Sequence, residues 1–341
     1  MTFLRNIWYV AGHAEEPGDT PFARTYLNEP VLIYRTESGA LVATDDRCPH
    51  RMAPLHRGKV IGETIQCPYH GLRFDGTGAC VAMPLGGDAP PRAKLRVYPI
   101  VERHSLLWIW MGDPDRADAA LVPDFSDRDD PAVGWFTGVI HAKANYQLLV
   151  DNLLDLTHSE FLHPFLSSPG WAGRNRQTVT QEGSQITVVN IAENDNILPV
   201  MAHFKPSLGK IGRTVQTERW QAPSLIRLSV DYFSGDDSIV LPSAHMLTPE
   251  TETTTHYFVR GGQHLDPSNA EMTAQMRAGV LAVFQNEDIP LIEGQQRYLG
   301  DTDLMAHEPA ILAADKGAIL ARRHLAQLIR AEQSQMAVAA E

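Results

Sequence analysis

Short apolar segments separated by turn residues fill the N-terminal third of the chain. No stretch before about residue 115 repeats its apolar positions with the helical period of 3.6 residues. Apolar segments bounded by glycine and proline are typical of β-strands. The pattern therefore predicts a small β-barrel or sandwich, with strands at residues 8–11, 22–27, 31–34, 41–44 and 106–111.

Helical spacing of apolar residues appears only in the remainder of the chain, at 151–163, 268–300 and 308–330. Pro290 interrupts the second of these segments and predicts a kink there. The alanine-rich tail after Gln333 is expected to fray.

Between the first two helical segments, apolar and polar residues alternate with the period of a strand. An antiparallel sheet that folds round a helix leaves a pocket between them. We therefore predict an α+β protein, with an all-β domain at residues 1–120 and a mixed domain at 121–341. The strands of the second domain are expected at residues 186–191, 220–233, 243–248 and 253–259.

The composition is that of an ordinary folded chain, and its charge limits the classes of partner that the protein can bind. Of 341 residues, 43% are hydrophobic and 21% are charged, and no apolar run is long enough to cross a bilayer. The net charge of −12 disfavours nucleic acid and anionic membranes, and an anionic substrate would need a local cation. The N-terminus lacks a secretory signal pattern, and three cysteines cannot form a disulfide framework. We therefore expect a cytoplasmic protein.

Two loops that contain cysteine and histidine carry the strongest chemical signal. Cys48 and His50 lie in the first loop, and after sixteen intervening residues Cys67 and His70 lie in the second. Zinc can bind two cysteines and two histidines. Here each loop supplies one of each, which suits a Rieske [2Fe-2S] cluster with both cysteines on one iron and both histidines on the other. The sequence favours the Rieske cluster over zinc.

A second candidate site lies in residues 151–163, where carboxylates and imidazoles interrupt an apolar helical pattern. Asp155 and His158 are three residues apart and would share a helix face. Pro164 disfavours helical backbone at His163, so the helix is expected to break there and bring His163 toward His158. Two histidines and a distant carboxylate would form the facial triad of a non-haem Fe(II) oxygenase, with open positions for O2. The alternative is a buried helix whose histidines are only hydrogen-bonded.

Taken together, these motifs resemble the oxygenase component of Rieske non-haem iron oxygenases, over nearly the whole chain. Flanking residues at 5–11, 66–72, 107–114, 145–155 and 247–252 resemble the branch of vanillate O-demethylase, toluenesulfonate methyl-monooxygenase and dicamba O-demethylase. The matching motifs are Cys48-x-His50, Cys67-x-x-His70 and Asn152-x-x-Asp155-x-x-His158-x4-His163.

The resemblance implies a Rieske domain, a helix-grip catalytic domain and a homotrimer. It implies that His158, His163 and an acid of the late helix hold the iron. Asp288 matches that acid, and Glu287 is the alternative.

Two further roles are implied by the same resemblance. Asp155 is expected to connect a ligand histidine of one subunit to the cluster ligand His70 of its neighbour. Asn152, one helical turn before Asp155, is expected to lie near the iron.

The implied reaction is oxidation of an aryl-attached methyl group, foremost O-demethylation of a methoxybenzoate such as vanillate with release of formaldehyde. No glycine-rich dinucleotide fingerprint follows a strand, so electrons are expected from an NAD(P)H-dependent reductase or a ferredoxin. One alternative is methyl hydroxylation of an aryl sulfonate or carboxylate. An alternative from another class is a non-catalytic Rieske protein for electron transfer and binding, which would have no use for the three iron ligands.

Two residues are candidates for binding an aromatic acid. Arg227 shares a strand face with Ser229 and Asp231, and that face could line the pocket or meet solvent. His245 precedes a hairpin turn and matches, by resemblance, a histidine that holds a substrate carboxylate in the family.

Overall fold

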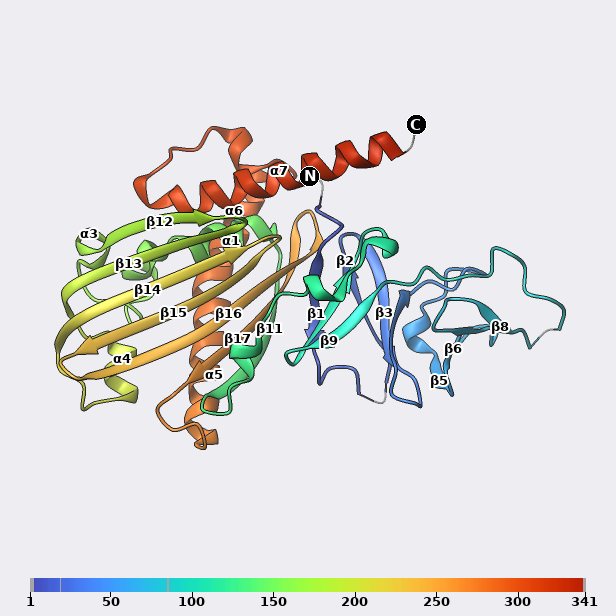
Figure 1. Cartoon of the computed structure of the whole chain (residues 1–341), viewed down its shortest axis with the longest axis horizontal. Helices are drawn as coiled ribbons and strands as arrows, with labels where there is room; N and C mark the ends of the chain where they lie inside the picture. The colour runs from blue at the N-terminus through green and yellow to red at the C-terminus, as the bar shows by residue number, and fades with distance from the viewer. Residues whose placement is uncertain (1–2, 19, 85, 340–341) are drawn as a thin grey trace. The chain divides into compact units, whose positions relative to one another are not determined.

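The structure, a computed structural model, describes residues 3–18, 20–84 and 86–339, which form two compact units (Figure 1). One unit covers Arg5–Asp129. The other begins at Asp130 and also takes in Phe3 and Leu4. None of the helices within the described ranges is long and apolar enough to cross a membrane.

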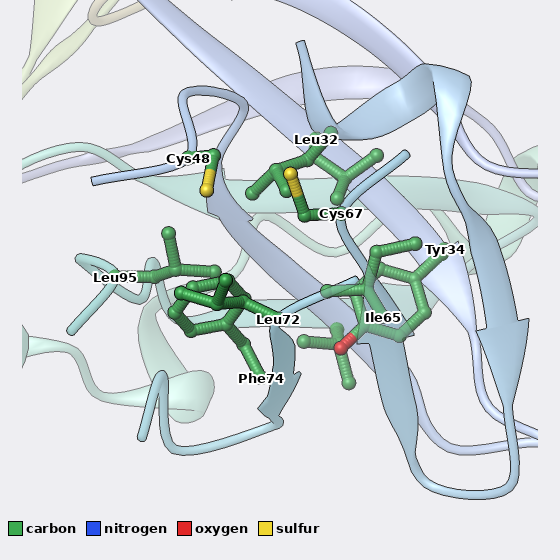
Figure 2. Close-up of a cluster of buried hydrophobic side chains, with 10 residues drawn as sticks. Leu32, Tyr34, Cys48, Ile65, Cys67, Leu72, Phe74 and Leu95 are labelled. Atoms are coloured by element: carbon green, nitrogen blue, oxygen red, sulfur yellow. The ribbon is translucent and has the colours of Figure 1, made fainter. Parts of the chain in front are cut away.

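Short antiparallel strands build the first unit, as the sequence predicts. They form three sheets, ordered β1-β10-β9, β2-β3-β4 and β5-β6-β7-β8. Leucine, isoleucine and aromatic side chains from these strands form a buried cluster (Figure 2). The strands are β1 (Trp8–His13), β2 (Phe22–Tyr26), β3 (Glu29–Arg35), β4 (Leu41–Asp45), β5 (Lys59–Ile61), β6 (Thr64–Gln66), β7 (Arg73–Asp75), β8 (Cys80–Ala82), β9 (Ile100–Arg103) and β10 (Leu106–Trp110).

The acidic segment after β10 is part of the first unit, which extends to Asp129. Phe125 is 1% exposed, and its ring centroid lies 5.7 Å from that of Trp108. The indole nitrogen of Trp8 donates to the Asp118 carbonyl at 2.9 Å. These aromatic anchors hold the segment against the sheet of β1 and β10, which acidic composition alone does not reveal.

One antiparallel sheet dominates the second unit, with the strand order β11-β17-β16-β15-β14-β13-β12. Burial alternates along β11 and β13, because successive side chains of a strand point to opposite faces. The predicted strand at 220–233 is in fact two strands joined by a turn that contains Pro223. The strands are β11 (Gly134–Ala142), β12 (Arg176–Glu182), β13 (Gln185–Asn196), β14 (Ile211–Gln221), β15 (Leu225–Ser234), β16 (Asp237–Thr251) and β17 (Thr254–Gln263).

Helices accompany this sheet, and α5 crosses it in Figure 1. Contrary to the expected fraying, the last helix continues to Ala339, because alanine has the highest helix propensity. Asp151 on the first helix accepts hydrogen bonds from Arg322 on the last, at 2.7 Å and 2.9 Å. The helices are α1 (Tyr146–Leu154), α2 (Ser159–Leu162), α3 (Trp171–Arg174), α4 (Pro199–Phe204), α5 (Ala270–Val283), α6 (Ile289–Leu299) and α7 (Lys316–Ala339).

Candidate active site and metal centres

In the first unit, Cys48 and Cys67 lie close together at the edge of the buried cluster (Figure 2). Each is 2% exposed. Tight loops follow both cysteines: the Met52 amide donates to the Cys48 carbonyl at 2.8 Å, and the Gly71 amide to the Cys67 carbonyl at 3.1 Å. Gly71 has a φ of +75°, a conformation that favours glycine.

The two histidines of these loops also meet. The ring centroids of His50 and His70 are 4.5 Å apart, and both rings are more exposed than the two thiols. Burial raises the pKa of the Cys48 thiol to about 11, so a metal that binds there has to displace its proton. Two neighbouring thiols and two neighbouring imidazoles are the donor set that a Rieske cluster requires.

In the second unit, the helix that carries the candidate iron ligands breaks earlier than the sequence predicts. α1 ends at Leu154, because Asp155 adopts an extended backbone with φ −133° and ψ 92°. A single 3-10 turn, η5 (Leu156–His158), and the short α2 follow. These two turns bring the ring centroids of His158 and His163 to 5.2 Å.

The acid that joins these histidines comes from the segment between α5 and α6. There the chain forms one π-helical turn, η6 (Phe284–Asp288), directly before Pro290. Such turns widen a helix and are common at functional sites. The predicted perturbation before Pro290 is therefore present, and it directs the buried Asp288 side chain toward the two histidines.

His158, His163 and Asp288 together form a group that could hold a metal ion, with one ligand atom from each and all three within 4.8 Å of one another. His163 Nε2 lies 3.0 Å from Asp288 Oδ1, and His158 Nε2 lies 3.5 Å from it. Two nitrogens and a carboxylate oxygen are the donor set of the facial triad.

Each histidine has its Nδ1 occupied, which leaves Nε2 to face the metal position. Glu287 lies 2.6 Å from His163 Nδ1, and the backbone carbonyl of Asp155 lies 2.6 Å from His158 Nδ1. A ring that donates from Nδ1 can offer the Nε2 lone pair to a metal once the Nε2 proton shared with Asp288 has left, and this is the usual arrangement of metal-binding histidines. Glu287 thus lies on the Nδ1 side of His163, whereas the carboxylate grouped with both histidines is that of Asp288.

The Asp155 carboxylate is oriented differently from the sequence expectation. Within its own chain it accepts hydrogen bonds from the backbone amide and hydroxyl of Thr157, at 2.9 Å and 2.6 Å. Its main-chain oxygen, and not its carboxylate, accepts the hydrogen bond from His158 of the same chain.

The electrostatics of the group favour a charged Asp288. Burial alone would raise the pKa of this carboxyl, but hydrogen bonds with His158 and His163 outweigh burial and lower the pKa to about 2. Asn152 donates to Asp288 Oδ1 at 3.0 Å and lies 3.4 Å from His158 Nε2. Asn152 thus lies beside the group formed by His158, His163 and Asp288.

A cavity of about 570 Å³ opens at this group. Its wall consists mostly of apolar side chains from the sheet, α4 and α5, and Asn152, His158, His163 and Asp288 all line it. This size suits a small aromatic molecule. No arginine or lysine lines the cavity among the residues that the structure describes.

His245 lies in the cavity wall and is 1% exposed. Its Nε2 is 2.9 Å from the hydroxyl of Ser243, and its Nδ1 is 2.8 Å from the hydroxyl of Tyr257. Ser243 also lines the cavity, so the two side chains form a polar point in an apolar wall. Ser243 could have been found from the sequence, because it lies two residues before His245 on the same strand face.

Arg227 lies outside the cavity. Its neighbours Leu228 and Val230 on β15 line the cavity, and alternation along the strand directs Arg227 to the opposite face. Of the two faces that the sequence left open for Arg227, the structure therefore favours the one away from the cavity.

A cluster-type donor set in a β domain, followed by a His-His-Asp group in a sheet-and-helix domain, defines an iron-dependent oxygenase component. The family comparisons agree. The Rieske [2Fe-2S] domain family matches residues 7–99, and the family described as vanillate O-demethylase oxygenase C-terminal domain matches residues 142–331.

Similar proteins cover the chain almost completely. It is 36% identical to the iron-sulfur subunit of the toluene-4-sulfonate monooxygenase system of Comamonas testosteroni, over 97% of this chain and 98% of that one. It is 35% identical to the oxygenase component of dicamba O-demethylase of Stenotrophomonas maltophilia, over 97% of this chain and 99% of that one. The crystal structure of dicamba monooxygenase bound to 3,6-dichlorosalicylic acid matches with a TM-score of 0.91 and 34% identity, over 98% of this chain and 99% of that one.

The chain belongs to the Rieske non-haem iron oxygenases, in the branch with the vanillate O-demethylase type of catalytic domain. It is a monooxygenase with a Rieske [2Fe-2S] domain and a group that could bind mononuclear iron. The predicted fold class and family are confirmed.

Proposed function

We propose that this protein removes the methyl group of an aryl methyl ether, foremost a methoxybenzoate such as vanillate, and releases formaldehyde. The reaction consumes one O2, two electrons and two protons, and yields a phenol, formaldehyde and water. The observation that carries the proposal is that the His158, His163 and Asp288 group lies in the wall of a mostly apolar cavity of about 570 Å³.

Cys48, His50, Cys67 and His70 would hold the cluster, and His158, His163 and Asp288 the iron. When bound, the cluster would supply electrons and the iron would supply O2-activating chemistry. The chain's own residues position the substrate and exclude water, and Asn152 donates a hydrogen bond to the ligand oxygen of Asp288.

Electrons would come from a separate NAD(P)H-dependent reductase or ferredoxin, in the cytoplasm. We further propose a homotrimer in which Asp155 accepts a hydrogen bond from His70 of the neighbouring subunit. In support, the Asp155 carboxylate is half-buried, and its Oδ1 is held by Thr157.

The Asp155→Asn variant tests this role. It should retain both metal centres and lose steady-state turnover, because electron transfer between subunits would be interrupted. Thr157→Val is the matched control, since it removes the local hydroxyl bond and keeps the carboxylate. Normal turnover of Asp155→Asn would eliminate the bridging role.

His245 would read the acid group of the substrate. A charge-assisted hydrogen bond contributes on the order of 1.5–3 kcal/mol, or roughly ten- to a hundred-fold in affinity. His245→Ala should therefore weaken the binding of vanillate far more than that of vanillin, its uncharged aldehyde. Equal losses for both compounds would contradict carboxylate recognition by His245.

Formaldehyde release under O2, with a suitable reductase, tests the proposed reaction directly. Vanillate should yield formaldehyde and 3,4-dihydroxybenzoate. The competing candidate is hydroxylation of a ring methyl, favoured by the similarity to the toluene-4-sulfonate system. Faster oxidation of 4-toluenesulfonate than of any methoxybenzoate would select that candidate instead.

A further inference from the structure

Gln216 on β14 is a buried polar residue in the apolar wall of the cavity. Its side chain is 2% exposed, and it lines the cavity. Its Oε1 atom has no hydrogen-bond partner within the described parts of the chain. As placed, this oxygen has no exposed area, and a buried acceptor without a donor is costly. Rotation of the amide is therefore favoured if it brings the oxygen to a donor that arrives from the cavity.

Two further buried groups lie behind Gln216 on the same sheet face. Asn190 on β13 is the register partner of Gln216, and Glu218 is two residues along β14. Both are 0% exposed, and Asn190 Nδ2 donates to Glu218 Oε1 at 3.4 Å. Asn190 Oδ1 and Glu218 Oε2 have no partner among the described residues. We call Asn190, Gln216 and Glu218 the acceptor row.

The acceptor row is rich in oxygen acceptors and poor in charge. Burial raises the pKa of Glu218 to about 8, so its carboxyl is mostly protonated at pH 7 and supplies one O–H donor, which the Oδ1 atom of Asn190 can accept. Rotation of the Gln216 amide would offer its nitrogen to an acceptor of Asn190 or Glu218 and turn its oxygen to the cavity. A carboxylate or sulfonate in the cavity would then meet the Gln216 oxygen, whereas a hydroxyl could donate to it.

Several other polar side chains of the cavity already have partners. Ser243 and His245 bond to each other, Asn152 bonds to Asp288, and Gln275 on α5 donates to Glu271 at 3.3 Å. Gln216 therefore differs from these residues in having an open acceptor.

We propose that Gln216 is a specificity-determining residue that accepts a hydrogen bond from a phenolic hydroxyl of the substrate. The inference rests on the proposed oxidation of an aromatic ring in this cavity. It narrows the substrate class to methoxylated phenols and assigns the acid group, where one is present, to the His245 end of the cavity.

The test uses two neutral probes of similar size, 2-methoxyphenol and 2-methylanisole, in which a methyl group replaces the hydroxyl. Their dissociation constants are measured by calorimetry on the metal-loaded protein under nitrogen. Wild-type protein should bind 2-methoxyphenol more tightly, and Gln216→Met should reduce that preference by about two- to ten-fold. Gln275→Met, which changes an already bonded amide in the same cavity, should leave the preference unchanged.

An unchanged preference in Gln216→Met would overturn the proposal, as would an equal loss in Gln275→Met. A crystal structure of the wild-type protein with 2-methoxyphenol decides the question without a variant. The hydroxyl should lie within hydrogen-bond distance of Gln216, and a hydroxyl bonded to Ser243 or His245 instead would contradict the proposal. Neither experiment needs turnover, so failure of demethylation and failure of this recognition are distinguishable.

Discussion

The two candidate metal sites are built in opposite ways. In the first unit, all four donors lie in two loops, each closed by hydrogen bonds within the loop itself. In the second unit, His163 and Asp288 are 125 residues apart and meet only because helices pack against one sheet. The first site therefore depends on local geometry, whereas the second depends on the fold of the whole unit.

The largest expected effect on iron content and turnover comes from removing the carboxylate of Asp288. Asp288→Ala should lose the mononuclear iron and reduce turnover to background, because two histidines alone make a weak site for Fe(II). Cluster absorbance should persist, since that site lies in the other unit. Metal analysis and visible spectra of the purified variant check both statements.

Glu287 provides the matched control for Asp288. Glu287→Gln keeps an acceptor for the Nδ1 proton of His163 and should be mild. Glu287→Leu removes that acceptor and should weaken iron binding by about ten- to a hundred-fold. A more severe loss of iron in Glu287→Gln than in Asp288→Asn would move the third ligand by one residue.

A third prediction concerns the stability of the second unit alone. Arg322 and Asp151 form an ion pair between α7 and α1 in which the arginine side chain is 8% exposed. Arg322→Met leaves a largely buried carboxylate without its partner and should cost about 3–5 kcal/mol of unfolding free energy. Asp303→Ala, which removes the longer contact to Arg322 at 3.3 Å, should cost much less.

Urea unfolding followed by far-ultraviolet circular dichroism and by cluster absorbance separates the two units. Arg322→Met should lower the urea midpoint of the circular dichroism transition of the second unit, while the midpoint of the cluster absorbance stays unchanged. Loss of both signals together would mean that the two units unfold as one.

A comparable effect on the free energy of unfolding should depend on pH, because Glu218 is buried. The ordinary pKa of 4.5 applies in the unfolded chain, and burial raises the folded pKa to about 8. Between these values the native state holds a proton that the unfolded state has lost, so stability falls as pH rises and levels off above the folded pKa. Glu218→Gln should remove this decline, on the order of a few kcal/mol. Denaturation midpoints from pH 5 to 9 measure it, with Glu193→Gln on the exposed end of β13 as the control.

The contrast between the two sites also explains what the sequence could predict. Cysteine and histidine spacing identified the first site, because its geometry is set within each loop. The histidine pair of the second site was also visible as a local motif. Asp288 was found by family resemblance, since nothing in its own segment indicates its distant partners.

Other features depended on tertiary packing. Periodicity placed Arg227 on one strand face but could not say which face lines the cavity. Asp155 was recognised as important, yet its main-chain oxygen, not its carboxylate, bonds to His158 in the same chain. Gln216 went unnoticed, because one glutamine in a strand gives no sign that it is buried beside a cavity.

The central claim is that one chain carries two independent iron sites, and iron and acid-labile sulfide counts on the wild type and His158→Ala test it most directly. Wild-type protein should contain about three irons and about two sulfides per chain, and His158→Ala about two of each, with an unchanged Rieske spectrum. Wild-type protein that contains zinc without sulfide, or a His158→Ala variant that loses its sulfide with its iron, would contradict the account.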